Sequence, residues 1–364
     1  MPWAGRRQVK KLKAWLPTLA AFILMLLSFI ITPPTGEMIV SLEWNGLAMI
    51  FVMTLTVAGI RKEKMIEAIE RSASVFTHLG STAAFFVVIA FILSPFITAL
   101  FAAPALTALA SAILKRKERS ELVPSFAAMI TAAATAGGMF LPAGSIGNMI
   151  YHRSIEAPFI TTMGPLVIAS SPVLALMIPI MLGKRTVEKT YITDESTPPS
   201  GNKGLRMFYA CFAFIITLTS FSLFSWPDIL FFSVIIILLF DRKVFVQADY
   251  RFILSALFLS IAGKCLEPFL VPFFAEGSYW KTVVLGEIIG QFPASAITLY
   301  QNADHGLLLR ALNASSFGTL SSLPALFVLL SLKKEERKEF LIRYTIIAIV
   351  MLLLLMVVTM ALAH

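Results

Sequence analysis

Apolar segments of about twenty residues recur along the chain and are separated by short polar or basic stretches. A helix of about 20 residues crosses the ~30 Å hydrocarbon core of a bilayer, whereas a membrane β-barrel would show shorter segments of alternating polarity. The pattern therefore predicts an all-α polytopic membrane protein. The expected spans cover residues 15–31, 44–60, 122–151, 160–182, 205–224, 228–240, 251–270 and 307–332, with a last span that ends at His364.

Basic residues are concentrated in the connections between these segments. They gather at 6–13, 61–71, 115–119, 184–189, 242–243 and 333–343. Because cytoplasmic loops of membrane proteins carry an excess of Lys and Arg, we expect these connections and the N-terminus on the cytoplasmic side. The C-terminus is then expected outside.

Residues 279–301 interrupt this pattern. The stretch LGEIIGQFPASA places Glu287, Gly290, Gln291 and Pro293 among apolar residues. If the segment crossed the membrane, the basic stretch KKEERK that follows would lie outside, against the positive-inside rule. Its first arm would also span only about 16 Å as a helix. We therefore expect a re-entrant hairpin that opens to the outside, with a turn that lines a cavity.

A similar interruption lies in residues 81–115. The apolar run breaks at Ser94 and Pro95, followed by Thr98, and basic residues flank both ends. The first arm, 81–93, would be about 20 Å long as a helix. Because both ends are basic, the charges fit either two short spans or a hairpin. The short arm and the lack of a polar turn favour a second re-entrant hairpin, open to the cytoplasm.

The two halves of the chain repeat one order of parts. Each half, 1–183 and 205–364, carries an apolar helix that ends in Ala-Gly and then a hairpin. A long helix with a Gly- and Ser-rich middle follows, at 122–151 and at 307–332, and a polar linker at 184–204, expected in the cytoplasm, joins the halves. Because the hairpins open to opposite sides, the halves are predicted to be inverted repeats, each with a re-entrant hairpin and a broken transmembrane helix. This architecture is typical of secondary transporters.

Composition agrees with a membrane protein and argues against other classes. The chain is 58% hydrophobic and 14% charged, and its net charge of +9 is scattered over short loops, so no nucleic-acid partner is expected. The sequence contains no HExxH, GxSxG or phosphate-loop motif. We expect no enzyme activity and no cofactor besides Na⁺ or H⁺ as a coupling ion.

Four short motifs carry a resemblance to a known family. They are SPFIT at 94–98, LPAGSIGN at 141–148, IIGQFPAS at 288–295 and NASSFGTL at 313–320. In this order, over residues 42–332, the chain resembles the ion-transporter superfamily, which includes divalent-anion/sodium symporters, citrate carriers, arsenical-pump membrane proteins and sodium/proton antiporters. The resemblance implies that these elements surround substrate and ions in a homodimer whose transport domain moves as an elevator.

The hairpin tips depart from the pattern of that family. Ala99 stands where Asn is common, and Gly290–Gln291 stand in place of Ser-Asn. At the first broken helix Ser145 stands where another Asn is usual, while Asn148 is retained. The departures imply fewer side-chain ligands for sodium than the family pattern supplies.

Neutral polar and small residues beside the breaks are the expected binding residues. Helix N-termini attract anions, and unwound carbonyls can coordinate sodium. The expected substrate- and ion-binding set is Ser94, Thr98, Pro142, Gly144, Ser145, Asn148, Gly290, Gln291, Pro293, Ser295, Asn313, Ser316, Gly318 and Thr319. A Na⁺ site is expected near Thr98, Ser145, Gln291 and Ser316.

Two charged residues are candidates for a proton or charge relay. Glu287 lies three residues before the second hairpin turn, and intramembrane acids are functional candidates; the alternatives are a structural ion pair and a hydrated position at the mouth. Arg310 suits a substrate oxyanion or, alternatively, reaches to the outer interface. Lys264 and Glu267 are expected to form a local pair.

The expected function is secondary active transport of a small anion, a carboxylate or an inorganic oxyanion, by a homodimer in a prokaryotic plasma membrane. A Na⁺ or H⁺ gradient would drive it by elevator-type alternating access. The first alternative is a sodium/proton antiporter or an arsenite-type efflux permease on the same fold, the latter with an ATPase subunit as partner. A transport-inactive membrane scaffold is the second alternative.

Overall fold

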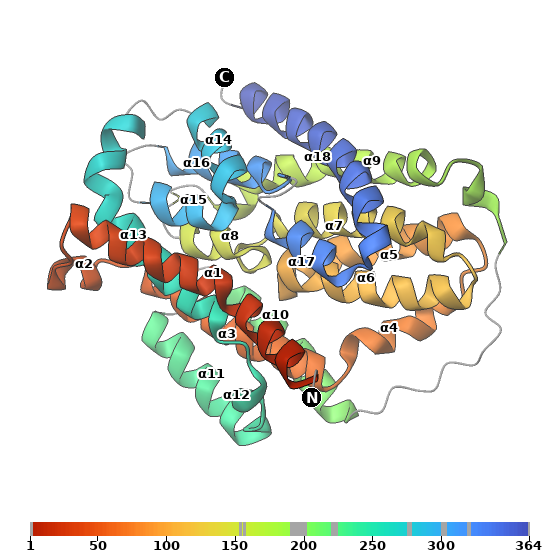
Figure 1. The fold of residues 1–364 in the computed structure, drawn as a ribbon, viewed down its shortest axis with the longest axis horizontal. Helices are drawn as coiled ribbons and strands as arrows, with labels where there is room; N and C mark the ends of the chain where they lie inside the picture. Colours follow the sequence, from red (N-terminus) through yellow and green to blue (C-terminus); the bar gives the residue numbers. More distant parts are fainter. Residues whose placement is uncertain are drawn as a thin grey trace.

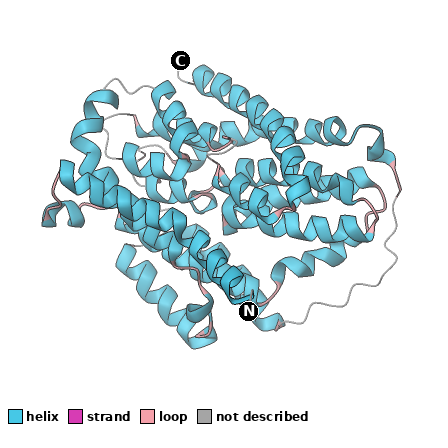
Figure 2. Cartoon of the chain, viewed as in Figure 1, coloured by secondary structure: helices cyan, strands magenta, loops and turns pink. Residues whose placement is uncertain are grey.

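The computed structural model describes residues 3–152, 155, 158–189, 202–219, 225–274, 279–299, 304–318 and 322–362. Within these ranges all regular elements are helices (Figure 2), and the only β-type contact is an isolated bridge between His78 and Lys189. The predicted all-α class is confirmed. The α-helices are α1 Trp3–Ile31, α2 Gly36–Val40, α3 Trp44–Lys62, α4 Met65–Ser74, α5 Leu79–Ile97, α6 Ala99–Arg116, α7 Val123–Gly138, α8 Ile146–Tyr151, α9 Phe159–Leu182, α10 Lys203–Thr219, α11 Trp226–Asp241, α12 Val244–Gln247, α13 Arg251–Phe274, α14 Tyr279–Ile289, α15 Gln291–Thr298, α16 His305–Ser315, α17 Leu323–Ser331 and α18 Lys334–Leu362. Short 3₁₀ turns are η1 Ser120–Leu122, η2 Pro142–Gly144 and η3 Gly183–Val187.

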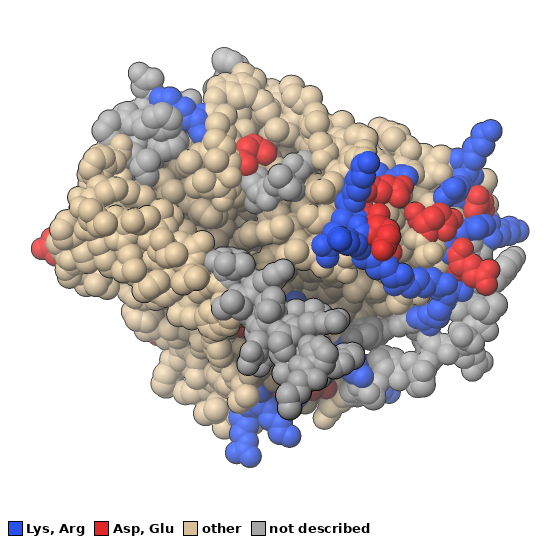
Figure 3. Space-filling view, in the orientation of Figure 1, with Lys and Arg blue, Asp and Glu red and all other residues tan. Residues whose placement is uncertain are grey.

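Several helices are long and apolar enough to cross a membrane. In the described part of the chain there are five, namely Trp44–Lys62, Leu79–Ile97, Ala99–Arg116, Phe159–Val187 and Lys334–Leu362. Large apolar side chains also point outward, such as Ile168 on α9, Leu239 on α11 and Val357 on α18, which are 73%, 77% and 65% exposed. Figure 3 shows a face that is uncharged over most of its area. Such a surface suits contact with lipid, so the chain is an integral membrane protein.

The helices form two groups that pack side by side (Figure 1). In the first, which we call the α3 group, α3 contacts α10, α11 and α13, and α1 runs along α13. In the second, the α7 group, α7 contacts α5, α6, α9, α17 and α18, while α16 joins α14 to α18.

Glycines bring the α3 group into backbone contact with α8 and α15. A Cβ atom at Gly46 of α3 would lie 2.8 Å from the Cα atom of Ile150 in α8. A Cβ at Gly263 of α13 would lie 2.4 Å from the carbonyl oxygen of Ala296 in α15. Only a residue without a side chain allows helices to approach this closely.

Two pairs of consecutive helices are separated by a single residue. Thr98 stands between α5 and α6 with φ 66° and ψ 144°, and Gly290 stands between α14 and α15 with φ 90° and ψ 154°. A positive φ is rare for a β-branched residue such as Thr. The two turns therefore share one unusual backbone conformation.

The first break lies later than the sequence suggested. The sequence placed it at Ser94 and Pro95, but α5 continues to Ile97 and the turn is at Thr98. Pro95 has no N–H for the carbonyl of Phe91, four residues earlier, and the Ser94 hydroxyl donates to that carbonyl oxygen at 3.4 Å instead. The first arm is therefore 19 residues long, about 28 Å.

The other two breaks lie within the predicted Gly- and Ser-rich regions. α7 ends at Gly138 and α8 begins at Ile146, with η2 between them; α16 ends at Ser315 and α17 begins at Leu323. At the first of these the backbone folds back on itself, since a Cβ at Gly144 would lie 2.2 Å from the carbonyl oxygen of Gly138. Residues 190–201 of the expected linker, residues 300–301 of the expected hairpin, Thr319 and His364 lie outside the described residues.

Candidate functional site

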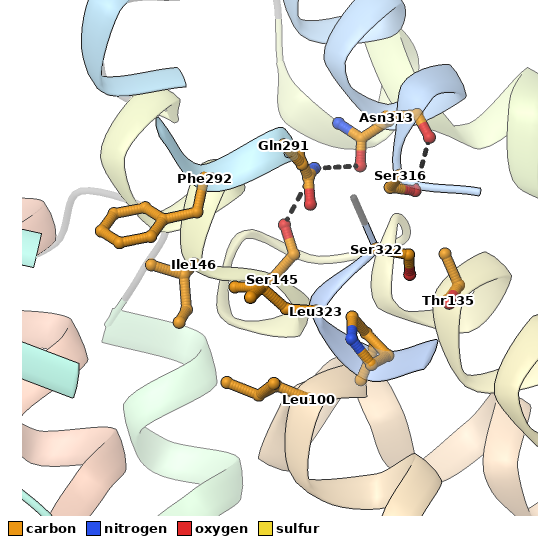
Figure 4. Close-up of a pocket in the computed structure, with 13 residues that line it drawn as sticks. Leu100, Thr135, Ser145, Ile146, Gln291, Phe292, Asn313, Ser316, Ser322 and Leu323 are labelled. Atoms are coloured by element: carbon orange, nitrogen blue, oxygen red, sulfur yellow. Dashed lines mark hydrogen bonds between the residues drawn. The ribbon is translucent and has the colours of Figure 1, made fainter. Parts of the chain in front are cut away.

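All four breaks meet at one internal cavity. It encloses about 40 Å³, and its walls come from the beginnings of α6, α8, α15 and α17 together with α7 and α16 (Figure 4). The described residues that line it are all uncharged. They are Ala99, Leu100, Thr135, Ser145, Ile146, Gly147, Gln291, Phe292, Asn313, Ser316, Ser322, Leu323 and Pro324.

Four helices begin at this cavity. Ala99, Ile146, Gln291 and Leu323 are the first residues of α6, α8, α15 and α17, and all four line the cavity. The first N–H groups of a helix have no partner within the helix, and the helix dipole places a partial positive charge at this end. Several helix starts around an uncharged space favour an anion at its centre.

A network of amide side chains connects the two halves of the chain at the cavity. The Nε2 atom of Gln291 donates to Ser145 Oγ at 3.3 Å and to Asn313 Oδ1 at 3.2 Å (Figure 4). The Nδ2 atom of Asn313 in turn donates to Asn148 Oδ1 at 2.8 Å and to the carbonyl oxygen of Leu309 at 2.9 Å. The network holds α15 against α8 and α16.

Asn148 also forms hydrogen bonds across the break between α7 and α8. Its Nδ2 atom donates to the carbonyl oxygen of Gly138 at 3.2 Å, and its backbone N–H donates to Ser145 Oγ at 3.1 Å, which caps α8. Asn148 and Asn313 are both fully buried. Because a buried amide without partners costs free energy, these bonds define the orientation of each side chain.

One wall of the cavity depends on a glycine. A Cβ atom at Gly147 would lie 2.5 Å from Ser295 Oγ and 3.3 Å from the side chain of Gln291. The hydroxyl of Ser295 itself donates to the carbonyl oxygen of Gln291 at 2.8 Å. Gly147 therefore allows α15 to approach α8 closely enough for Gln291 to reach Ser145.

Four residues of the predicted site line the cavity, namely Ser145, Gln291, Asn313 and Ser316. Asn148 and Ser295 are bonded to them, and Gly290 is the turn residue just before Gln291. The rest lie in the segments around the cavity without lining it: Ser94, Thr98, Pro142, Gly144, Pro293 and Gly318. Thr319 lies outside the described residues.

Hydroxyl groups and the amide oxygen of Gln291 are the side-chain ligands available for the predicted Na⁺ site. Ser316 Oγ donates to the carbonyl oxygen of Asn313 at 2.6 Å, which leaves its lone pairs free to face the cavity. Thr98 is 1% exposed, and its Oγ1 has no hydrogen-bond partner among the described residues. Where the structure is described, no group of three or more His, Cys, Asp or Glu residues could hold a metal ion.

The two charged candidates lie outside the cavity lining. The Nε atom of Arg310 donates to the carbonyl oxygen of Thr162 in α9 at 3.2 Å. The Oε1 atom of Glu287 is buried and has no hydrogen-bond partner within the described ranges. The expected pair between Lys264 and Glu267 is confirmed, with Nζ and Oε2 2.7 Å apart.

Three polar or small lining residues were missed in the sequence. Thr135 lies in an Ala-rich helix, Gly147 was expected only as part of a break, and Ser322 lies beside the buried phenol of Tyr344, whose hydroxyl donates to its Oγ at 3.4 Å. A small polar residue in an apolar helix has the same pattern whether it packs against a neighbour or faces a cavity. The positions of Gly147 and Ser322 beside helix starts were the available signal.

The fold and the cavity define an all-α integral membrane protein with an uncharged polar site where broken helices meet. The sequence matches no protein-family model and no curated protein.

Proposed function

We propose that the protein is a secondary active transporter of a small anion, a carboxylate or an inorganic oxyanion, driven by a Na⁺ or H⁺ gradient. One observation carries the proposal: four helices begin at a single small cavity whose lining is uncharged and includes two amide and four hydroxyl side chains. Helix starts favour a negative charge, and neutral side chains can bind and release an anion without a permanent counter-ion.

We further propose that α5–α6 and α14–α15 are re-entrant hairpins related by an inverted repeat. The matching backbone conformation of Thr98 and Gly290 supports this relation. α14 and α15 have 11 and 8 residues, about 16 and 12 Å, which is too short to cross a bilayer. α5 and α6 are long enough to cross, but the turn between them is buried, with Thr98 1% and Ala99 4% exposed. A turn at the membrane surface would face water.

These parts support membership of the ion-transporter superfamily that the sequence resembles. The breaks at 98, 138–146, 290 and 315–323 fall in or directly beside the four motifs of that resemblance. The division into an α3 group and an α7 group fits a scaffold and a moving domain, and all four breaks belong to or adjoin the α7 group. A homodimer built on the α3 group is part of this proposal.

Glu287 favours protons as the coupling ion. Its Oε1 atom is buried and unpartnered in the described structure, and a carboxyl group in that position is stabilised when it takes up a proton. The hairpin tips also carry Ala99 and Gln291 where the family pattern has Asn, and Gly290 where it has Ser, so they hold fewer side-chain oxygen ligands for Na⁺ than that pattern supplies. The same carboxyl would serve a sodium/proton antiporter.

The proposal is tested by the thermal stability of the purified protein and by uptake into proteoliposomes. Succinate, malate, citrate, sulfate, phosphate and arsenite are each added with Na⁺ or K⁺ at two pH values, and an anion that binds the folded state raises Tm. Counterflow of the same anion then establishes transport. Exchange of Na⁺ for H⁺ without any anion would instead establish the antiporter, and no flux under any gradient would leave a scaffold.

A further inference from the structure

A second, larger cavity lies beside the end of α3. It is open to the surface on one side and holds about 400 Å³, a volume within the range of small-molecule sites. The described residues that line it are Thr54, Val57, Ala58, Arg61, Lys62, Phe101, Gln247 and Asp249. It lies among the basic connections, at the end of α3 that the charge pattern predicts to be cytoplasmic.

Two of its three charged residues are already engaged. Lys62 Nζ donates to both carboxylate oxygens of Asp241, at 2.6 and 2.7 Å. Asp249 accepts from the Nε atom of Arg251 at 2.6 Å through Oδ1 and from the NH2 atom of Arg251 through Oδ2. These charges are compensated within the protein.

Arg61 is different. Its guanidinium carbon lies 5.1 Å from the centre of the Phe101 ring, its side chain is exposed, and among the described residues it donates no hydrogen bond. Asp249 acts on it electrostatically, but that carboxylate is bonded to Arg251. A guanidinium supported by an aromatic ring keeps its planar fork of N–H donors for a carboxylate or oxyanion.

The first turn of α6 separates this cavity from the central one. Phe101 lines the larger cavity, while Ala99 and Leu100, the two residues before it, line the central cavity. The start of α6 thus forms part of the wall of both cavities.

We propose that the larger cavity is a vestibule in which Arg61 binds a small carboxylate or oxyanion on its way to or from the central cavity, across the wall formed by Leu100 and Phe101. The inference rests on the proposed function, because it names the entry site of the same transported anion. Its ligand is recognised by two N–H groups of one guanidinium, the geometry that suits a carboxylate, sulfate or phosphate.

Chemical modification of Arg61 tests the binding directly. Inside-out membrane vesicles that contain the full chain are treated with phenylglyoxal, with and without succinate or sulfate, and modification is followed by peptide mass spectrometry. We expect either anion, added at about ten times its Kd, to slow the modification of Arg61 about tenfold, because only about a tenth of the Arg61 sites are then free. Arg242, exposed at the end of α11 outside the vestibule, is the control and should react at the same rate throughout. Equal rates at Arg61 with and without the anions would overturn the proposal.

Transport from each side of the membrane gives a second readout. Arg61→Gln is expected to raise the KM for the anion about tenfold from the Arg61 side, with little change from the opposite side. Arg61→Lys, which keeps the charge and loses the planar fork, should lie between the two. A change of equal size from both sides would mean that Arg61 acts on the fold rather than at the entry, and would contradict the proposal.

Failure of this inference and failure of the proposed function are distinguishable. Protection of Arg61 does not depend on the central cavity, so it should persist in Asn313→Ala. If wild-type protein transports none of the anions while Arg61 is still protected, the transporter proposal fails and the anion site stands. If transport occurs and Arg61 is not protected, the vestibule fails alone.

Discussion

The Nδ2 atom of Asn313 lies 2.8 Å from the Oδ1 atom of Asn148, across 165 positions of sequence. Both side chains are fully buried, and each also holds a backbone carbonyl, that of Leu309 or that of Gly138. The bond joins the two broken helices, one from each half of the chain. The geometry of the central cavity therefore depends on contact between the halves.

A double-mutant cycle measures this contact. We expect Asn148→Ala and Asn313→Ala each to lower the free energy of unfolding by about 1–3 kcal/mol, because each leaves a buried amide partner unsatisfied. The pair should show a coupling energy of about 1 kcal/mol, measured by chemical denaturation in detergent. Lys338→Ala, at an exposed position of α18, is the control. Strict additivity of the two buried substitutions would contradict the hydrogen bond.

Gly147→Ala should impair transport. The new methyl group would lie 2.5 Å from Ser295 Oγ and would press on Gln291, so α15 must shift and the bond from Gln291 to Ser145 is lost. Gly164→Ala is the matched control: it lies in α9 with nothing within 4 Å of the added atom, and it should be neutral or up to about 1 kcal/mol stabilising. Uptake and Tm are measured for both variants, and equal activity would argue against a tight cavity wall.

The two turn residues should respond oppositely to substitution. Thr98→Gly removes a strained side-chain conformation and a buried unpaired hydroxyl, and is expected to raise stability by about 1 kcal/mol. Gly290→Ala introduces a side chain at φ 90° and is expected to lower stability by about 1–2 kcal/mol. Thermal unfolding in detergent checks both signs, and a loss of stability in Thr98→Gly would mean that the Thr side chain holds the turn.

Thr98→Gly also tests the predicted ion site. If Thr98 Oγ1 binds the coupling ion, the stabilised variant should need a higher Na⁺ concentration for half-maximal transport. Stability and ion affinity would then change in opposite directions, which a purely structural role of Thr98 does not produce. An unchanged dependence on Na⁺ would remove Thr98 from the ion site.

Glu287→Gln is expected to remove the pH dependence of transport. If the carboxyl carries the coupled proton, wild-type uptake falls as the external pH rises, because the protonated form becomes scarce, while the amide variant gives a flat profile. Glu267→Gln is the control, since the Glu267 carboxylate is paired with Lys264 at 2.7 Å. A Glu287→Gln variant that keeps the full wild-type profile would rule out the relay.

Local chemistry in the sequence locates the helix breaks well. Gly290, the Gly-rich stretch after Ala136 and the Ser-rich stretch after Asn313 all interrupt helices where residue type predicts it. The turn at Thr98 was predicted four residues early, because Pro95 is normally a helix breaker and its lost hydrogen bond is replaced by the Ser94 hydroxyl. That compensation depends on a single rotamer, which residue type does not reveal.

Contacts between residues far apart in the sequence cannot be predicted from residue type in the same way. Gln291 contacts Ser145, 146 positions away, and Arg310 donates to Thr162 O, 148 positions away. No periodic pattern encodes such pairs, because they depend on how whole helices pack. The prediction that Arg310 meets substrate or lies at the outer interface named neither its bond to Thr162 nor its distance from the cavity lining.

Gly46 and Gly263 place backbone against backbone where the α3 group contacts α8 and α15. Interlocked side chains must separate before one helix can slide along another. Where two backbones are in direct contact, there are no such side chains to separate. At these two contacts the α3 group has no side chain that interlocks with α8 or α15. In the elevator movement that we propose, α8 and α15 would slide along these two contacts, and a methyl group added at either glycine would hinder that movement.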